Sequence, residues 1–90
     1  MLALDPDVTY CLGITAHPDP GAIARIIEPF AKLGLVPLSI NARLFSDAGE
    51  LTVDVQIAGI GPDQCRRIAN QIAAMPVVRR VVTGEKQVLG

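Results

Sequence analysis

The residue types and spacing best suited to binding chemistry lie between residues 17 and 23, in the stretch HPDPGAI. Asp19 is expected to be the N-cap of a helix with Pro20 at its first position, because proline lacks an N–H that would be unsatisfied there. The next backbone N–H groups have no partner within the helix. Together with the helix dipole they favour an anion, such as the carboxylate of a small amino acid. These groups belong to Gly21, Ala22 and Ile23.

A second interpretation of this turn involves no ligand. The side chain of Asp19 can itself accept hydrogen bonds from the free N–H groups, and the turn then only joins a strand to a helix. Gly21 would let a ligand approach the backbone closely. The residues of the turn alone leave both interpretations open.

The sequence offers no assembly of catalytic side chains. His17 is the only histidine, and neither Ser39 nor Ser46 lies in a GxSxG turn. Cys11 and Cys65 are far apart, without the spacing of a metal site or a redox motif. No glycine-rich phosphate-binding motif is present. We therefore expect a non-catalytic protein with two free thiols, no metal and no cofactor.

Composition indicates one small domain that associates with itself or a partner. The chain has 90 residues, of which 50% are hydrophobic and only 19% charged, so polar residues to coat a monomer are few. A net charge of −1, with no Trp and a single Tyr, disfavours nucleic-acid binding. The sequence lacks a signal peptide pattern and a long apolar run, which predicts a cytoplasmic protein without a membrane span.

Periodicity predicts six elements between a leader (residues 1–9) and a polar tail (84–90). Alternating apolar residues indicate strands, and apolar residues three and four apart indicate helices. Gly34 is expected to end the first helix, Pro29 to kink it without breaking it, and Pro37 to place the second strand at a sheet edge. The predicted order is strand 10–16, helix 19–33, strand 36–44, strand 51–58, helix 61–75 and strand 77–83.

This order predicts an α+β fold of the ferredoxin-like βαββαβ type. Two right-handed crossovers place both helices on one face of a four-stranded antiparallel sheet. The usual strand order of this fold is 4-1-3-2, which leaves the second strand at an edge, in agreement with Pro37. The other face of the sheet is expected to be uncovered, with small and polar side chains that can be solvated or paired.

The order of elements and the turn together resemble the ACT domain (residues 10–83), a ligand-binding module of amino-acid metabolic enzymes. The resemblance rests on a strand, then a turn of the type Asn/Asp-x-Pro-Gly, then an amphipathic helix, here HPDPGAIARI. Within that family the sequence is most similar to the short form of the small regulatory subunit of acetolactate synthase, on the segment LGLVPLSINARLFSDAGELTVDVQIAG.

The resemblance implies a regulatory protein that dimerises through its second strand and first helix. It implies an amino acid bound between the first turn of one copy and the second strand of the other, and a large catalytic subunit as a possible partner. The implied ligand-binding residues are Asp19, Gly21, Ala22 and Ile23, and the implied interface residues are Val36, Leu38, Ile26 and Phe30.

Two departures from the family pattern keep alternatives open. Pro18 and Val36 stand where valine-sensitive small subunits have asparagines, so both side-chain hydrogen bonds to the ligand would be absent. A stand-alone dimeric metabolite sensor and a purely structural pairing module are therefore alternatives. A ferredoxin-like enzyme such as an acylphosphatase is disfavoured, because it needs an arginine in the first loop and this loop has none.

Overall fold

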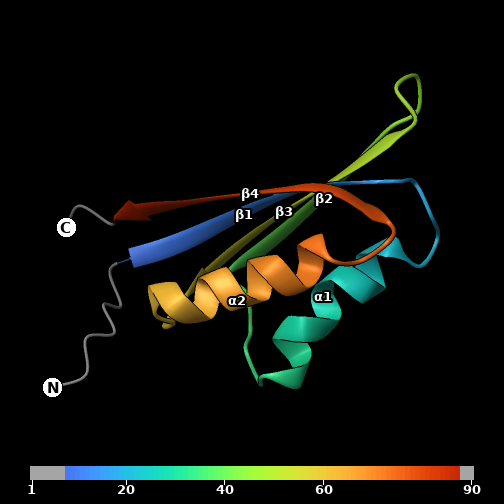
Figure 1. Cartoon of the computed structure of the whole chain (residues 1–90). Helices are drawn as coiled ribbons and strands as arrows, with labels where there is room; N and C mark the ends of the chain where they lie inside the picture. Colours follow the sequence, from blue (N-terminus) through green and yellow to red (C-terminus); the bar gives the residue numbers. More distant parts are fainter. Residues whose placement is uncertain (1–7, 88–90) are drawn as a thin grey trace, which may run out of the picture.

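The computed structural model describes residues 8–87, which form the six elements in the predicted order (Figure 1). The predicted leader and tail fall outside the described residues at 1–7 and 88–90. The elements are β1 (Val8–Ala16), α1 (Ala22–Lys32), β2 (Ser39–Phe45), β3 (Glu50–Ala58), α2 (Pro62–Ala73) and β4 (Val78–Gln87).

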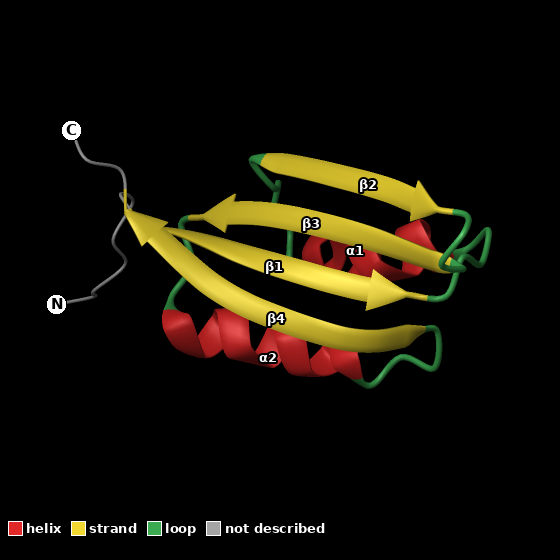
Figure 2. Cartoon of the chain, turned by 90° about the horizontal axis from the view of Figure 1, so that it is seen from above, coloured by secondary structure: helices red, strands yellow, loops and turns green. Residues whose placement is uncertain are grey.

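The four strands form one antiparallel sheet in the order β2-β3-β1-β4. Both helices lie against one face of this sheet and the opposite face is uncovered (Figure 2). The ferredoxin-like prediction and the edge position of β2 are thus confirmed. Edge strand β4 carries one irregularity, because Thr15 pairs with Arg80 while Ala16 pairs with Val78. Arg79 is the extra residue of this β-bulge.

The core fills the layer between the sheet and the two helices. Alternate residues of β1 and β3 point into it, as strand geometry requires. The largest fully buried side chains are Phe30, Leu12, Ile14, Ile26, Ile57, Ile68, Ile72, Val53 and Val55. Burying each of these contributes about 1.5–3 kcal/mol relative to leaving it exposed.

Helix α1 ends in a Schellman motif, as the glycine after its apolar face predicts. Gly34 has φ 70°, its N–H donates to the carbonyl of Ala31, and the N–H of Leu35 donates to the carbonyl of Phe30. These two bonds satisfy carbonyls that the helix end would otherwise leave free. Pro29 lies inside the helix, which continues to Lys32, so the prediction that Pro29 does not break it is confirmed.

Helix α2 begins where the sequence Gly61-Pro62-Asp63 predicts. Gly61 is its N-cap, Pro62 is in the first turn and Asp63 adds a negative charge near the positive end of the helix dipole. The helix ends at Ala73, slightly before the predicted end at Met75.

Three predicted strand ends differ from the structure by two residues or more. Strand β1 begins at Val8, within the predicted leader, and β4 continues to Gln87, within the predicted tail. These two additions pair with each other, Val8 opposite Gln87 and Thr9 opposite Lys86, so each strand end gives the other its hydrogen-bond partners. Strand β2 begins at Ser39, which leaves Pro37 in the preceding loop.

Two of the four predicted interface residues are core residues. Ile26 and Phe30 are each 0% exposed and pack between α1 and the sheet, so they offer no surface to a partner. The other two are on the surface, with Val36 86% and Leu38 64% exposed. Helical spacing identified the apolar side of α1, and that side faces this chain's own sheet.

Candidate functional site

The turn between β1 and α1 is held by its own hydrogen bonds. The N–H of Gly21 donates to Oδ1 of Asp19 at 2.8 Å, and the N–H of Ala22 donates to the carbonyl of Asp19 at 3.0 Å. The N–H of His17 donates to the carbonyl of Val77, which ties the turn to the segment before β4. Asp19 therefore closes a tight turn before the helix begins.

This geometry corrects the predicted start of α1. The N-cap is Gly21, without a side-chain cap bond, and the helix begins at Ala22, so Asp19 is not the N-cap and Pro20 lies before the helix. The prediction that the N–H groups of Gly21 and Ala22 are unpaired is wrong, because Asp19 accepts from both.

Two helix N–H groups remain available at the turn. Within residues 8–87, the N–H groups of Ile23 and Ala24 have no hydrogen-bond acceptor, as is usual for a first helical turn. Sequence analysis identified Ile23 but not Ala24. An anion at this end of α1 would meet these two N–H groups and the positive end of the helix dipole.

Arg25 is a further charged residue at the turn that sequence analysis missed. Its Nη1 lies 3.9 Å from Oδ1 of Asp19, and both side chains are about half exposed. A Cβ on Gly21 would lie 3.5 Å from Asp19 Oδ1 and 3.6 Å from the Arg25 guanidinium, which is ordinary contact. Arg25 also lines a cavity of about 420 Å³ with Glu28, Met75, Pro76 and Val77. The turn thus offers a carboxylate, a guanidinium and two N–H groups to a zwitterionic ligand.

Arg79, at the β-bulge, links three segments at this end of the sheet. Its guanidinium donates to Nδ1 of His17 at 2.9 Å and to the carbonyl of Gly49 at 3.2 Å, and it lies 3.6 Å from the carboxylate of Glu50. A guanidinium has only donors, so Nδ1 of His17 must be the acceptor and the ring proton lies on Nε2. His17 therefore has a structural partner that explains its presence without catalysis.

The exposed apolar surface of the chain is concentrated at β2 and the loop before it. All seven residues of β2 are exposed. Ile40 and Leu44 pair with the core residues Val55 and Leu51, so they lie on the helix side of the sheet, yet they are 45% and 60% exposed. We call the following set the β2 surface: Val36, Leu38, Ile40 and Leu44 from the loop and strand.

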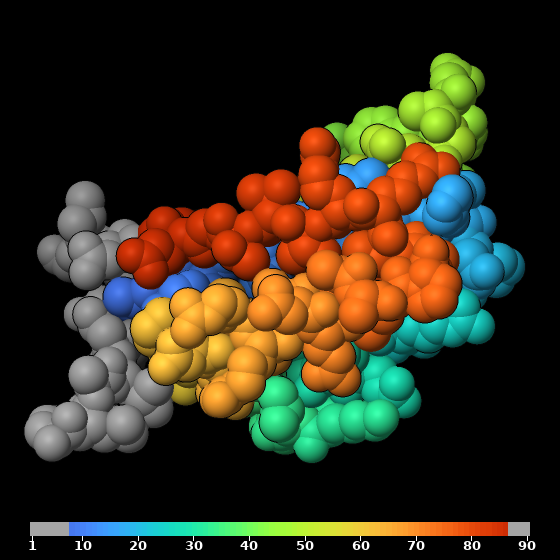
Figure 3. All heavy atoms as spheres, in the orientation of Figure 1, coloured from blue at the N-terminus to red at the C-terminus, as the bar shows by residue number. Residues whose placement is uncertain are grey.

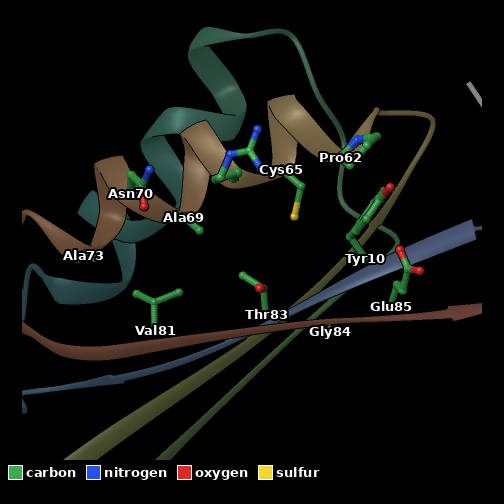
Figure 4. A pocket seen from close by; sticks show the side chains of 11 residues that line it. Tyr10, Pro62, Cys65, Ala69, Asn70, Ala73, Val81, Thr83, Gly84 and Glu85 are labelled. Atoms are coloured by element: carbon green, nitrogen blue, oxygen red, sulfur yellow. The ribbon is translucent and has the colours of Figure 1, made fainter.

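A second cavity, of about 460 Å³, lies between α2 and β4 at the other end of the sheet (Figures 3 and 4). It contains none of the predicted ligand-binding residues. Small residues on α2, Ala69 and Ala73, and Gly84 on β4 leave the space open. The thiol of Cys65 points into this space between helix and sheet (Figure 4). Burial, and to a lesser degree the negative charge of Glu85, raise the pKa of Cys65 above its ordinary value, so this thiol is a poor nucleophile.

The two cysteines should therefore differ in reactivity. Cys11 is partly exposed on the uncovered side of β1, whereas Cys65 is 4% exposed. At pH 8 we expect the variant Cys65→Ser, which retains Cys11, to react at least 10-fold faster with a disulfide reagent than Cys11→Ser does. Denaturant should abolish the difference, since it removes the burial that raises the pKa. Equal rates in the folded chain would contradict this assignment.

Two kinds of site are not found in the described part of the chain. Among residues 8–87 no three His, Cys, Asp or Glu side chains are grouped to hold a metal ion. No helix in the same range has the length and apolar character needed to cross a membrane.

Comparison with known proteins identifies the fold. Neither a protein-family model nor a curated protein matches the sequence. Among solved structures, the C-terminal domain of the MgtC protein from Mycobacterium tuberculosis has a TM-score of 0.72 at 14% identity, covering 96% of this chain and 95% of that one. The ACT domain from the GTP pyrophosphokinase of Chlorobium tepidum has a TM-score of 0.72 at 15% identity, covering 83% and 95%.

A regulatory subunit is also among the similar structures. That of aspartate kinase from Thermus flavus has a TM-score of 0.63 at 16% identity, covering 90% of this chain and 53% of that one. At these identities the likeness concerns the fold. The chain has the ferredoxin-like fold, which it shares with the ACT domain of this GTP pyrophosphokinase.

Proposed function

We propose that the chain is a non-catalytic regulatory module that dimerises through the β2 surface and binds a small amino acid at the turn before α1. The observation that carries the proposal is the position of the two features on one molecule. The β2 surface is an unpaired strand edge with apolar side chains, and the two free N–H groups of α1 lie at the end of the sheet where β2 finishes.

An exposed edge strand of seven residues is a ready template for a second strand. Pro37 lies before β2, so every residue of the strand has an N–H and the proline does not interrupt pairing between copies. Antiparallel pairing about a two-fold axis at Ala42 would place Ser39 of each copy opposite Phe45 of the other. The Val36–Leu38 loop of the partner would then approach the end of the sheet that carries the turn.

Such pairing would complete the proposed ligand site. The turn supplies the N–H groups of Ile23 and Ala24 for a carboxylate and the side chain of Asp19 for an ammonium, while the partner's loop supplies apolar contact. The predicted roles of Gly21 and Ala22 reduce to shaping the turn, since their N–H groups are already used.

The proposal is tested by thermal unfolding in the presence of each of the twenty amino acids. A ligand at ten times its dissociation constant stabilises the folded state by about 1.4 kcal/mol, which raises Tm by about 6 to 11 °C for a domain of this size. The variant Ile23→Pro removes one N–H from the first helical turn, where proline is tolerated. Its matched control, Ile23→Ala, loses the side chain and retains the N–H.

We expect the rise in Tm to be lost in Ile23→Pro and retained in Ile23→Ala. A rise that persists in both variants would place the ligand elsewhere. No rise with any amino acid would remove the ligand from the proposal and leave the pairing.

The catalytic partner is proposed to be a large subunit of an amino-acid biosynthetic enzyme in the cytoplasm, of the acetolactate synthase type. Adding the purified chain to such a subunit is expected to change its turnover. Unchanged turnover with the folded dimer would remove this partner and favour a stand-alone sensor.

One observation favours a second function, that of a pairing module without a ligand. Asp19 already satisfies two of the three N–H groups that sequence analysis assigned to a ligand, and it lies near Arg25 within the same turn. Such a module would dimerise normally and show no rise in Tm with any amino acid.

A further inference from the structure

The uncovered face of the sheet is a second surface, separate from the β2 surface (Figure 2). The pairing register places alternate residues of each strand on it, on the side opposite the core. From β2 to β4, its three central rows are Ser39, Gln56, Cys11 and Gly84; Asn41, Asp54, Gly13 and Val82; and Arg43, Thr52, Thr15 and Arg80.

The centre of this face is hollow. Two adjoining cavities of about 610 Å³ and 320 Å³ lie over it, and both are lined by Gly13, Asp54 and Val82. Gly13 lacks a side chain on the central strand, and an added Cβ there would lie 3.5 Å from Oδ1 of Asp54. Beside the hollow stands Val82, which is 56% exposed. The face therefore has an apolar projection next to a depression.

The charged side chains of the face are unpaired. Within residues 8–87, the side chains of Arg43, Asp54 and Arg80 make no hydrogen bond or ion pair, although they lie in neighbouring rows. By contrast, Arg79 and Glu50 at the end of the sheet are paired. Both signs of charge are present on one face, which suits a self-complementary contact.

We propose that this face binds the same face of a second copy, so that two dimers stack into a tetramer. Asp54 and Arg80 lie two strands and two residues apart, about 9.6 Å across and 6.8 Å along the strands. A two-fold axis lying in the face midway between them brings Asp54 of each copy to Arg80 of the other. With the same spacings, that axis also places Val82 of each copy over Gly13 of the other. The lateral offset between the two residues, measured in the plane of the sheet, is about 3 Å.

The size of the face predicts a weak contact between dimers. Four strands of seven residues measure roughly 19 by 24 Å, or on the order of 450 Å², using the usual strand spacing and rise. Stable interfaces need about 800 Å² from each partner, so contact through one face should form only at high protein concentration. The axis that joins Asp54 to Arg80 does not intersect the Ala42 axis of the β2 dimer, so each contact joins one face of one dimer to one face of another. The inference therefore rests on the proposed dimer.

The test is sedimentation equilibrium of the full chain and its variants over a range of concentrations. We expect the unaltered chain to form tetramers at high concentration, and Asp54→Arg or Arg80→Asp alone to weaken the step from dimer to tetramer at least 10-fold. The double variant Asp54→Arg/Arg80→Asp exchanges the charges, so it should restore that step to within about 3-fold. A structural defect in either single variant would persist in the double variant.

Cys11 provides a second measurement, because it lies on the same face beside Gly84. In the Cys65→Ser variant, the rate at which Cys11 reacts with a thiol reagent should fall as the protein concentration rises. Asp54→Arg in that background should make the rate independent of concentration.

The outcomes separate this inference from the proposed function. A chain that stays dimeric at every concentration overturns the stacking and leaves the dimer intact, whereas a monomeric chain overturns both. Single variants that remain tetrameric, or a double variant no better than either single, also overturn the stacking. An amino-acid-induced rise in Tm that is lost in Asp54→Arg and retained in Ile23→Pro would show that the face holds a small molecule instead.

Discussion

Replacing Phe30 with alanine is expected to lower the free energy of unfolding by about 3–5 kcal/mol. Phe30 is 0% exposed and packs with Ile26 between α1 and the sheet. Its removal takes a large apolar group out of the core and leaves a cavity that the neighbouring side chains only partly fill. Since a small domain has only about 5–15 kcal/mol of stability, this is the largest effect of a single change that we expect within one chain.

Urea unfolding measures this change, and concentration distinguishes a core residue from an interface residue. If Phe30 is a core residue, the loss of stability is present at low protein concentration, where the chain is monomeric. Phe30→Leu is the matched control, because it keeps most of the apolar volume and should cost less than about 1.5 kcal/mol. A Phe30→Ala chain with unchanged monomer stability and weakened dimerisation would restore the interface role that the sequence suggested.

The sequence predicts the order and type of all six elements because its apolar periods are clear. Tyr10, Leu12, Ile14 and Ala16 alternate along β1 over a one-sided core, and a period of two has no helical interpretation. Gly34 and Pro62 mark a helix end and a helix start through backbone geometry that few other residues favour. These signals are local, so the sequence contains them in full.

The strand ends were missed where that signal is absent. The last residues of β4, including Gly84, Glu85 and Lys86, are exposed at a sheet edge and have no apolar alternation. They belong to the strand because β1 pairs with them, which is a contact between residues more than seventy positions apart. Similarly, the Asp-Pro-Gly turn is compatible with two helix starts, and only the bond from Gly21 to Asp19 decides between them.

The candidate site could be predicted only in part for a related reason. The sequence shows that Ile26, Phe30, Val36 and Leu38 are apolar, but not which of them the helix layer covers. That depends on how far α1 reaches across the sheet, and β2 lies beyond its cover. Arg79 and Arg25 were missed because their partners depend on the β-bulge and on the closed turn.

Replacing Leu38 with aspartate is expected to convert the dimer into a folded monomer. Leu38 is 64% exposed in the single chain, so the change costs the monomer little. In the dimer, each copy would place one carboxylate in the apolar contact, at the two opposite ends of the paired strands. Burying an unpaired charge is strongly unfavourable. We expect the dissociation constant to rise about 100-fold or more, measured by sedimentation equilibrium, with the urea midpoint of the monomer nearly unchanged.

The matched control for Leu38→Asp is Val82→Asp, which introduces the same side chain at an exposed apolar residue on the uncovered face of the sheet. The β2 surface is intact in that variant, so it should still form dimers, although dimers should no longer stack. Because the two variants differ only in the surface they alter, monomers from Leu38→Asp together with dimers from Val82→Asp would assign pairing to β2. Dimers that survive Leu38→Asp and are lost in Val82→Asp would assign pairing to the uncovered face, and the proposed ligand site would then lack the partner loop that completes it.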